Sequence, residues 1–132
     1  MRKYLVLLWL LLPLPFVVLH YGRGQQWLAR DQANDLVRKA WSAEQKNDWK
    51  TADSLYREAA RLAAKDQPQL RLGLDLAQVR TRFRMGEAVT AIDMAERLVN
   101  DPAMTAAPQA LQREARDLSA RIHYYAAWVM RL

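Results

Sequence analysis

Few side chains of the types that carry chemistry occur in this sequence. Its 132 residues include no cysteine and only two histidines, His20 and His123, which excludes thiolate zinc sites, cysteine nucleophiles and histidine-rich metal centres. No serine stands in a nucleophile elbow, and Gly22 and Gly24 lack the third glycine and the preceding strand of a phosphate-binding loop. We therefore expect a protein that is not an enzyme and that uses no cofactor and no metal.

His20 keeps one cofactor hypothesis open. It follows an apolar run, where an imidazole can ligate the metal of a tetrapyrrole, so the alternative is an accessory subunit of a membrane electron-transfer or light-harvesting complex. A single histidine without a cluster favours an interfacial residue that binds no ligand. His123, between Ile122 and Tyr124, is expected to be a packing residue.

The charged side chains show no catalytic pattern. Asp53 and Arg57 have the i, i+4 spacing of a solvated ion pair on a helix surface. The densest basic group, Arg80, Arg82 and Arg84, lies in the last turns of a predicted helix, where cations complement the helix dipole. There is no continuous basic stripe, so nucleic acid is not expected as a partner.

The first element that the sequence predicts is a membrane anchor. Tyr4 to Leu19 contains no charged residue, and through Tyr21 the run gives about 18 residues, or about 27 Å of helix, close to the roughly 30 Å hydrocarbon thickness of a bilayer. We predict a transmembrane anchor over residues 1–24, with its helix ended by Gly22 and Gly24. The prolines are expected to bend it against neighbouring membrane helices. The residues assigned to the anchor are Trp9, Pro13, Pro15 and Phe16.

A cleaved signal peptide is the competing interpretation of this segment, and it predicts a secreted or periplasmic repeat protein. Leu19 to Gly24 lacks the small residues of a cleavage site, which favours an uncleaved anchor. Positive charge in the first three residues favours a cytoplasmic N-terminus. The expected location is therefore a single pass through a bacterial inner membrane, in contact with membrane lipid, with the helical domain in the periplasm.

The pattern of apolar residues over residues 25–132 predicts an all-α domain. Apolar residues recur with helical spacing from Ala33 to Trp41 and from Ala52 to Ala63, and the same spacing predicts helices at 68–85, 87–100 and from about 108 onward. The turns at Asn47 and Gly86 are 39 residues apart, as are the apolar faces of the helices before them. These features are typical of a small α-solenoid of helix-turn-helix units.

The repeats resemble the tetratricopeptide family. In the first unit the similarity lies in Asn47, Asp48, Trp49, Ala52, Tyr56 and Ala59, and in the second unit it lies in Gly86, Glu87, Ala91, Ala95 and Leu98. Two features depart from the family pattern, since the period is near 39 instead of 34 and the Trp, Leu and Gly cluster of the first helix is largely missing. Other helical hairpin repeats and irregular helical bundles stay open. The resemblance implies a curved surface that holds another protein.

The fifth helix of this domain carries a heptad pattern at its apolar positions. These are Leu111, Ala115, Leu118, Ile122, Tyr125, Val129 and Leu132. One side is expected to pack on the preceding helix, while the aromatic end is expected to contact a partner. The predicted partner-binding residues are Tyr124, Tyr125, Trp128 and Met130. Self-association through this helix stays an alternative.

These features together predict a non-catalytic scaffold. We expect a single-pass membrane protein that displays a TPR-like domain and mediates protein–protein interaction as a structural subunit of a membrane-associated complex. Its expected partners are the protein subunits of that complex and membrane lipid.

Overall fold

The computed structural model describes residues 13–63, 67–129 and 131, with side chains from Leu28 onward. The described chain is entirely helical, without a strand, which confirms the predicted all-α class. Its helices are α2 (Pro13–Gln45), α3 (Trp49–Leu62), α4 (Pro68–Arg84), α5 (Ala88–Val99), α6 (Pro102–Thr105) and α7 (Gln109–Val129).

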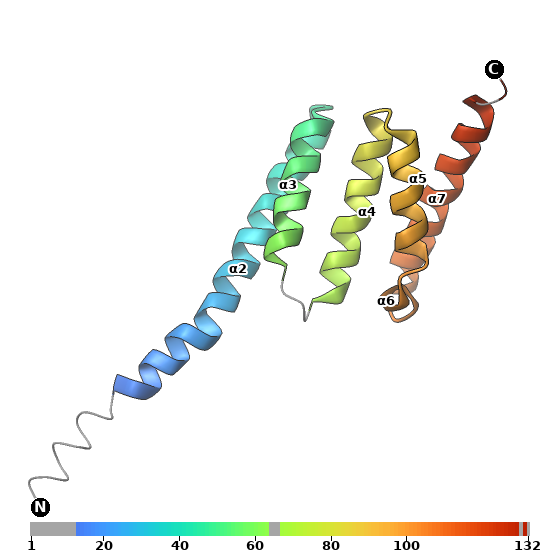
Figure 1. The fold of residues 1–132 in the computed structure, drawn as a ribbon. Helices are drawn as coiled ribbons and strands as arrows, with labels where there is room; N and C mark the ends of the chain where they lie inside the picture. The colour runs from blue at the N-terminus through green and yellow to red at the C-terminus, as the bar shows by residue number, and fades with distance from the viewer. Residues whose placement is uncertain (1–12, 64–66, 130, 132) are drawn as a thin grey trace, which may run out of the picture.

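The helices stack side by side in the order of the sequence (Figure 1). Helices α2 and α3 form one antiparallel hairpin and α4 and α5 a second, while α7 packs on α5 and also touches α4. Both hairpin turns lie at the same end of the array as the C-terminal end of α7, and the connections between hairpins lie at the opposite end (Figure 1). Beyond that opposite end, α2 extends past its neighbours toward the N-terminus.

Turn residues with positive φ separate the helices of each hairpin. Asn47 has φ 57° and Gly86 has φ 82°, a backbone conformation that asparagine and glycine adopt more readily than other residues. Asp48 then begins α3 as its N-cap, since its carboxylate accepts a hydrogen bond of 3.1 Å from the Thr51 N–H. Pro68 begins α4, where the missing N–H costs little. The predicted turns are therefore present at the expected residues.

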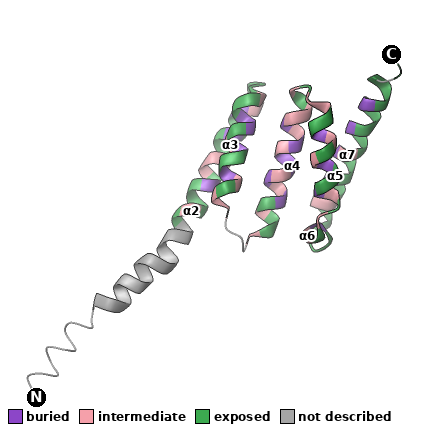
Figure 2. Cartoon of the chain, viewed as in Figure 1, coloured by how far each residue is buried: buried purple, intermediate pink, exposed green. Residues whose placement is uncertain are grey.

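Two hydrophobic clusters form the core, and α4 contributes to both (Figure 2). Leu74 and Ala77 belong to the cluster with α2 and α3, whereas Leu72, Leu76 and Val79 belong to the cluster with α5, α6 and α7. These residues alternate around the helix, so α4 buries two opposite faces. Its position at the centre of the array explains why α4 buries more residues than α3, α5 or α7.

The helix that contains Gly22 and Gly24 does not end there, contrary to the sequence prediction. The backbone of α2 is helical without interruption from Pro13 to Gln45. A glycine inside a helix costs only about 1 kcal/mol relative to alanine, and helical segments on both sides continue through it. Of the predicted anchor residues, Pro13, Pro15 and Phe16 lie in α2 without described side chains, and Trp9 lies outside the described residues.

Half of the predicted membrane span lies outside the described part of the chain. Its first nine residues, Tyr4 to Leu12, precede the start of α2. None of the helices that the structure describes contains a stretch both long and apolar enough to cross a bilayer.

Candidate protein-interaction surface

Three of the four residues predicted to bind a partner lie in the last turns of α7. The side chain of Tyr124 is 77% exposed and that of Trp128 is 54% exposed. Tyr125 is also exposed, but the edge of its ring contacts Phe83 of α4, with ring centroids 5.3 Å apart. Met130 lies outside the described residues. The structure thus brings three of the four predicted residues together at one end of the array.

The predicted heptad positions of α7 divide into a buried part and an exposed part. Ala115, Leu118 and Ile122 are buried in the cluster with α4 and α5, as is expected of an amphipathic helix that packs on its predecessor. Val129, the last residue of α7, is exposed. The heptad pattern is therefore mainly a core pattern, and only its last turns offer a surface to another protein.

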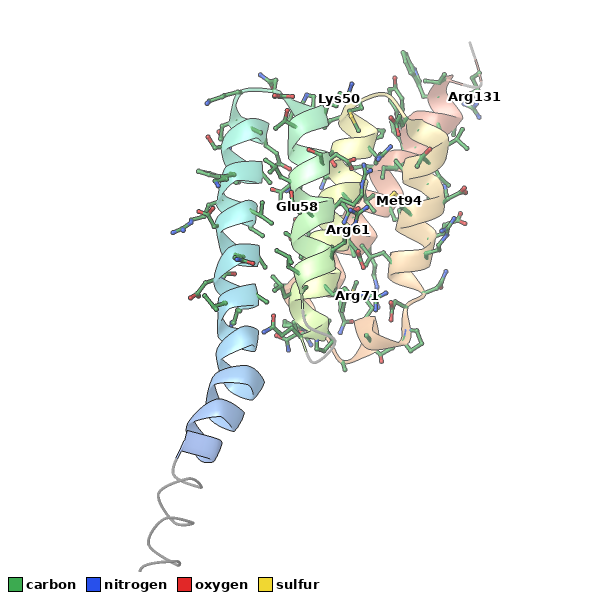
Figure 3. All side chains as sticks on the ribbon, turned by 60° about the vertical axis from the view of Figure 1, so that its left-hand side comes forward. Lys50, Glu58, Arg61, Arg71, Met94 and Arg131 are labelled. Carbon is green, nitrogen blue, oxygen red and sulfur yellow. The ribbon has the colours of Figure 1, made fainter. Side chains whose placement is uncertain are left out.

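A hollow lies beside the exposed aromatic rings. It has a volume of about 280 Å³ and is lined by Tyr124, Ala127, Trp128 and Arg131. Figure 3 shows Arg131 at the C-terminal end of α7, at the edge of the molecule. A cation next to aromatic rings and a small residue forms a site that accepts an apolar side chain and a neighbouring carboxylate.

The three arginines in the last turns of α4, Arg80, Arg82 and Arg84, each have a different partner, which spacing alone did not predict. Arg80 lies 3.1 Å from Glu44 of α2 and 3.6 Å from Glu114 of α7, so it links the first helices of successive units. Arg84 stacks over the ring of Trp49 at 5.6 Å from the ring centroid. Both arginines therefore make specific contacts between helices in addition to any effect on the helix dipole.

Arg82 forms the most buried of these contacts. It donates to both carboxylate oxygens of Asp53, at 3.0 Å from Nε and 2.7 Å from Nη2, and its Nη1 lies 2.6 Å from Glu87. These hydrogen bonds raise the pKa of Arg82. The hydrogen bond to Glu87 has the largest effect, followed by those to Asp53. Asp53 is only 3% exposed and also pairs with Arg57. The prediction of a solvated Asp53–Arg57 pair is wrong, because α4 covers the carboxylate.

Of the two histidines, only His123 has a described side chain. His123 is exposed, not packed as predicted. It lies at the solvent-exposed edge of α7 next to α5, where its Nε2 is 3.5 Å from Glu96. The side chain of His20 lies outside the described residues. Within the described part of the chain, no three acidic, histidine or cysteine side chains are grouped so that they could hold a metal ion.

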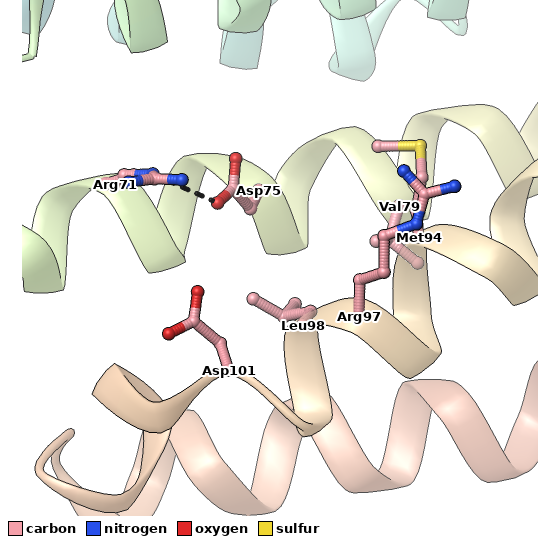
Figure 4. A pocket seen from close by; sticks show the side chains of 7 residues that line it. All are labelled: Arg71, Asp75, Val79, Met94, Arg97, Leu98 and Asp101. Atoms are coloured by element: carbon pink, nitrogen blue, oxygen red, sulfur yellow. Dashed lines mark ion pairs between the residues drawn. The ribbon is translucent and has the colours of Figure 1, made fainter.

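A second cavity lies between α4 and α5 (Figure 4). It has a volume of about 230 Å³, and its lining residues are Arg71, Asp75, Val79, Met94, Arg97, Leu98 and Asp101. Burial raises the pKa of Asp75; Arg71, at 3.8 Å, opposes this effect, and the negative charge of Asp101 adds to it. The cavity carries charges of both signs and no nucleophile, so it offers no evident chemistry.

Comparisons with known proteins give no relative for this chain. No protein family model matches the sequence, and no curated protein or solved structure matches it significantly. The resemblance to tetratricopeptide repeats therefore stays a prediction from the residues.

Proposed function

We propose that this protein is a non-catalytic scaffold or structural subunit of a membrane-associated complex. Residues 1–24 anchor it as a single pass through a bacterial inner membrane, with the N-terminus in the cytoplasm. The helices that follow form a small TPR-like solenoid in the periplasm. The C-terminal end of α7 contacts another protein subunit of the complex.

The observation that carries this proposal is the exposure of the aromatic residues on α7. Tyr124 and Trp128 lie one turn apart, with most of the first ring and half of the second in contact with solvent. Large exposed apolar groups beside a hollow are typical of interaction sites, and tyrosine and tryptophan are the residues that most often dominate binding energy. A partner that covers these rings would gain hydrophobic free energy at no cost to the core.

The arrangement of the helices suits an anchor and a docking surface in one small protein. The N-terminal part of α2 extends from one end of the array, and the aromatic residues of α7 lie at the other end (Figure 1). If the anchor continues from α2, the membrane and the docked protein contact opposite ends of the molecule. Neither contact then obstructs the other.

Photo-crosslinking in native membranes tests the proposal. A photoreactive phenylalanine at position 124 is expected to give one discrete adduct with another protein, identified by mass spectrometry. Position 89 is the matched control, because Val89 is 76% exposed, as much as Tyr124, but lies on a different helix, α5. Equal labelling at both positions, or no adduct at position 124 from a monodisperse, partner-free preparation, would contradict the proposed docking role.

A further inference from the structure

The position of α7 in the array identifies the face that is open. The face of α4 toward α3 carries Leu74, Ala77 and Thr81. The residues 41 positions later are Ala115, Leu118 and Ile122, which form the face of α7 toward α5. Helix α7 therefore packs on α5 in the same way as α4 packs on α3. Equivalent positions of α4 and α7 are 41 residues apart, two more than the period of 39 seen in the sequence.

The opposite face of α4 is covered by α5, and its counterpart on α7 is not covered by any described residue. On α4 this face carries Leu72, Leu76, Val79 and Phe83. The residues 41 positions later are Arg113, Asp117, Ala120 and Tyr124, and all of them are exposed. The place that a helix occupies beside α2 and beside α4 is thus open beside α7.

The charges of this open face are mainly positive. Arg113, Arg121 and Arg131 lie on it, with Asp117 as the single acidic residue. Over the described residues, the ion pairs of α7 are those of Glu114 and His123, so these arginines have no carboxylate partner within the described chain. Arg113 and Arg121 donate only to neutral oxygens of α7 itself, the Gln109 amide and the Asp117 carbonyl. A surface with guanidinium groups that lack a carboxylate partner and with exposed aromatic rings is complementary to a helix that carries both carboxylates and apolar side chains.

We propose that the open face of α7 binds an acidic amphipathic helix of the partner protein, in the place that α5 occupies on α4. This inference rests on the proposed docking function and names the chemistry of the partner. Apolar side chains of that helix contact Tyr124 and Trp128 and fill the hollow beside them, while its carboxylates pair with Arg113 and Arg121. Ala120 and Ala127 leave room for the close approach of a second helix.

A second copy of the chain is a poorer occupant of this face. Two α7 helices packed against each other through it would bring Arg113, Arg121 and Arg131 of one copy near the same residues of the other. Asp117 alone cannot neutralise them, and like charges across an interface are destabilising. Charge complementarity therefore favours a partner of opposite charge.

Binding of synthetic helical peptides to the full chain in detergent micelles tests the inference. The first probe is a labelled peptide with leucines along one face, glutamates beside them and alanines elsewhere. The second has every glutamate replaced by lysine. Fluorescence anisotropy is expected to show that the acidic peptide binds at least about tenfold more tightly than the lysine peptide, with the difference decreasing at high salt.

Two charge-reversed variants locate the binding site. Arg113→Glu with Arg121→Glu is expected to weaken binding of the acidic peptide about tenfold or more. Lys50→Glu with Arg61→Glu changes the net charge equally on the exposed surface of α3 (Figure 3) and is expected to leave binding unchanged. Circular dichroism on both variants separates loss of binding from loss of fold.

The outcomes distinguish this inference from the proposed function. Equal binding of both peptides, or equal effects of the two double variants, would overturn the acidic-helix assignment, whereas an adduct at position 124 would still support docking. A concentration-dependent dimer that Tyr124→Ala with Trp128→Ala abolishes would show that the occupant is a second copy, and it would overturn the assignment as well.

Discussion

Asp53 illustrates at the scale of single residues what spacing reveals and what it conceals. Its distance of four residues from Arg57 predicts their ion pair, which the structure contains. Its pairing with Arg82 joins residues 29 positions apart and depends on how α4 lies against α3. Local periodicity carries no information on that packing, so the burial of the carboxylate could not be predicted. The same holds for Arg80, whose partners lie on two other helices.

Asp75 predicts a dependence of stability on pH. Burial raises the pKa of its carboxyl above the usual 3.8, so the folded state favours the protonated form. As the pH rises from about 3.8 through the raised pKa, ionisation of Asp75 lowers the free energy of unfolding. Below about pH 3.8 the carboxyl is protonated in both the folded and the unfolded state, so Asp75 has no effect on stability there.

Asp75→Asn is therefore expected to raise the melting temperature near neutral pH. The gain over the native chain should disappear as the pH falls below the unfolded pKa of about 3.8. Thermal unfolding monitored by circular dichroism across this range measures the difference. Asp93→Asn, on the exposed surface of α5, is the control. A lower melting temperature for Asp75→Asn at every pH would mean that the ion pair with Arg71 outweighs burial.

At the scale of helices, the sequence predicts most of the secondary structure and less of the packing. Helical spacing and turn residues place α3, α4 and α5 within a few residues, because these signals are local. The break at Gly22 and Gly24 is wrong, since glycine weakens a helix without ending it. The short helix α6 is also missed, because its residues are predicted to form a loop. With α6 in the connection, equivalent positions of α4 and α7 are 41 residues apart instead of 39.

Substitution by alanine is expected to have a large effect on stability at the buried face of α7 and a small effect at its exposed face. Ile122 is fully buried, so Ile122→Ala is expected to reduce the free energy of unfolding by about 2–5 kcal/mol. Trp128→Ala removes an exposed ring and is expected to change it by only about 0.5 kcal/mol, while weakening partner binding. Urea unfolding of the two variants provides the measurement. A large loss of stability in Trp128→Ala would show that this ring belongs to the core.

At the scale of the whole molecule, the sequence predicts an anchor and a helical array. The excess of positive charge is concentrated near the N-terminus and in residues 109–132, which include α7. Arg2, Lys3 and Arg23 flank the apolar run, and they account for half of the net charge of +6. In the described chain, Arg80, Arg82 and Arg84 of α4 make contacts between helices. The arginines on the open face of α7 have no carboxylate partner among the described residues. A total charge cannot distinguish these roles, which require the fold.

The proposed anchor predicts how the chain fractionates. The full-length protein is expected to stay with the membrane pellet after alkaline carbonate extraction, at its intact mass of 15.3 kDa, because an uncleaved apolar helix holds it in the bilayer. Deletion of residues 1–24 is expected to release the helical domain into the soluble fraction with its helix content largely retained. A smaller mature mass in the soluble fraction of the native protein would favour a cleaved signal.

The central position of α4 has a mechanical consequence. Among the described residues, both clusters of the core include side chains of α4, so this helix connects the hairpin that follows the proposed anchor to the helix that carries the docking surface. A pulling force between the membrane and a bound partner would pass through α4, and the weaker cluster would open first. The alanine-rich contact of α2 with α3 buries smaller side chains than the cluster around Leu72 and Ile122. Extension is therefore expected to begin in the hairpin next to the proposed anchor and to spare the end with the proposed docking surface.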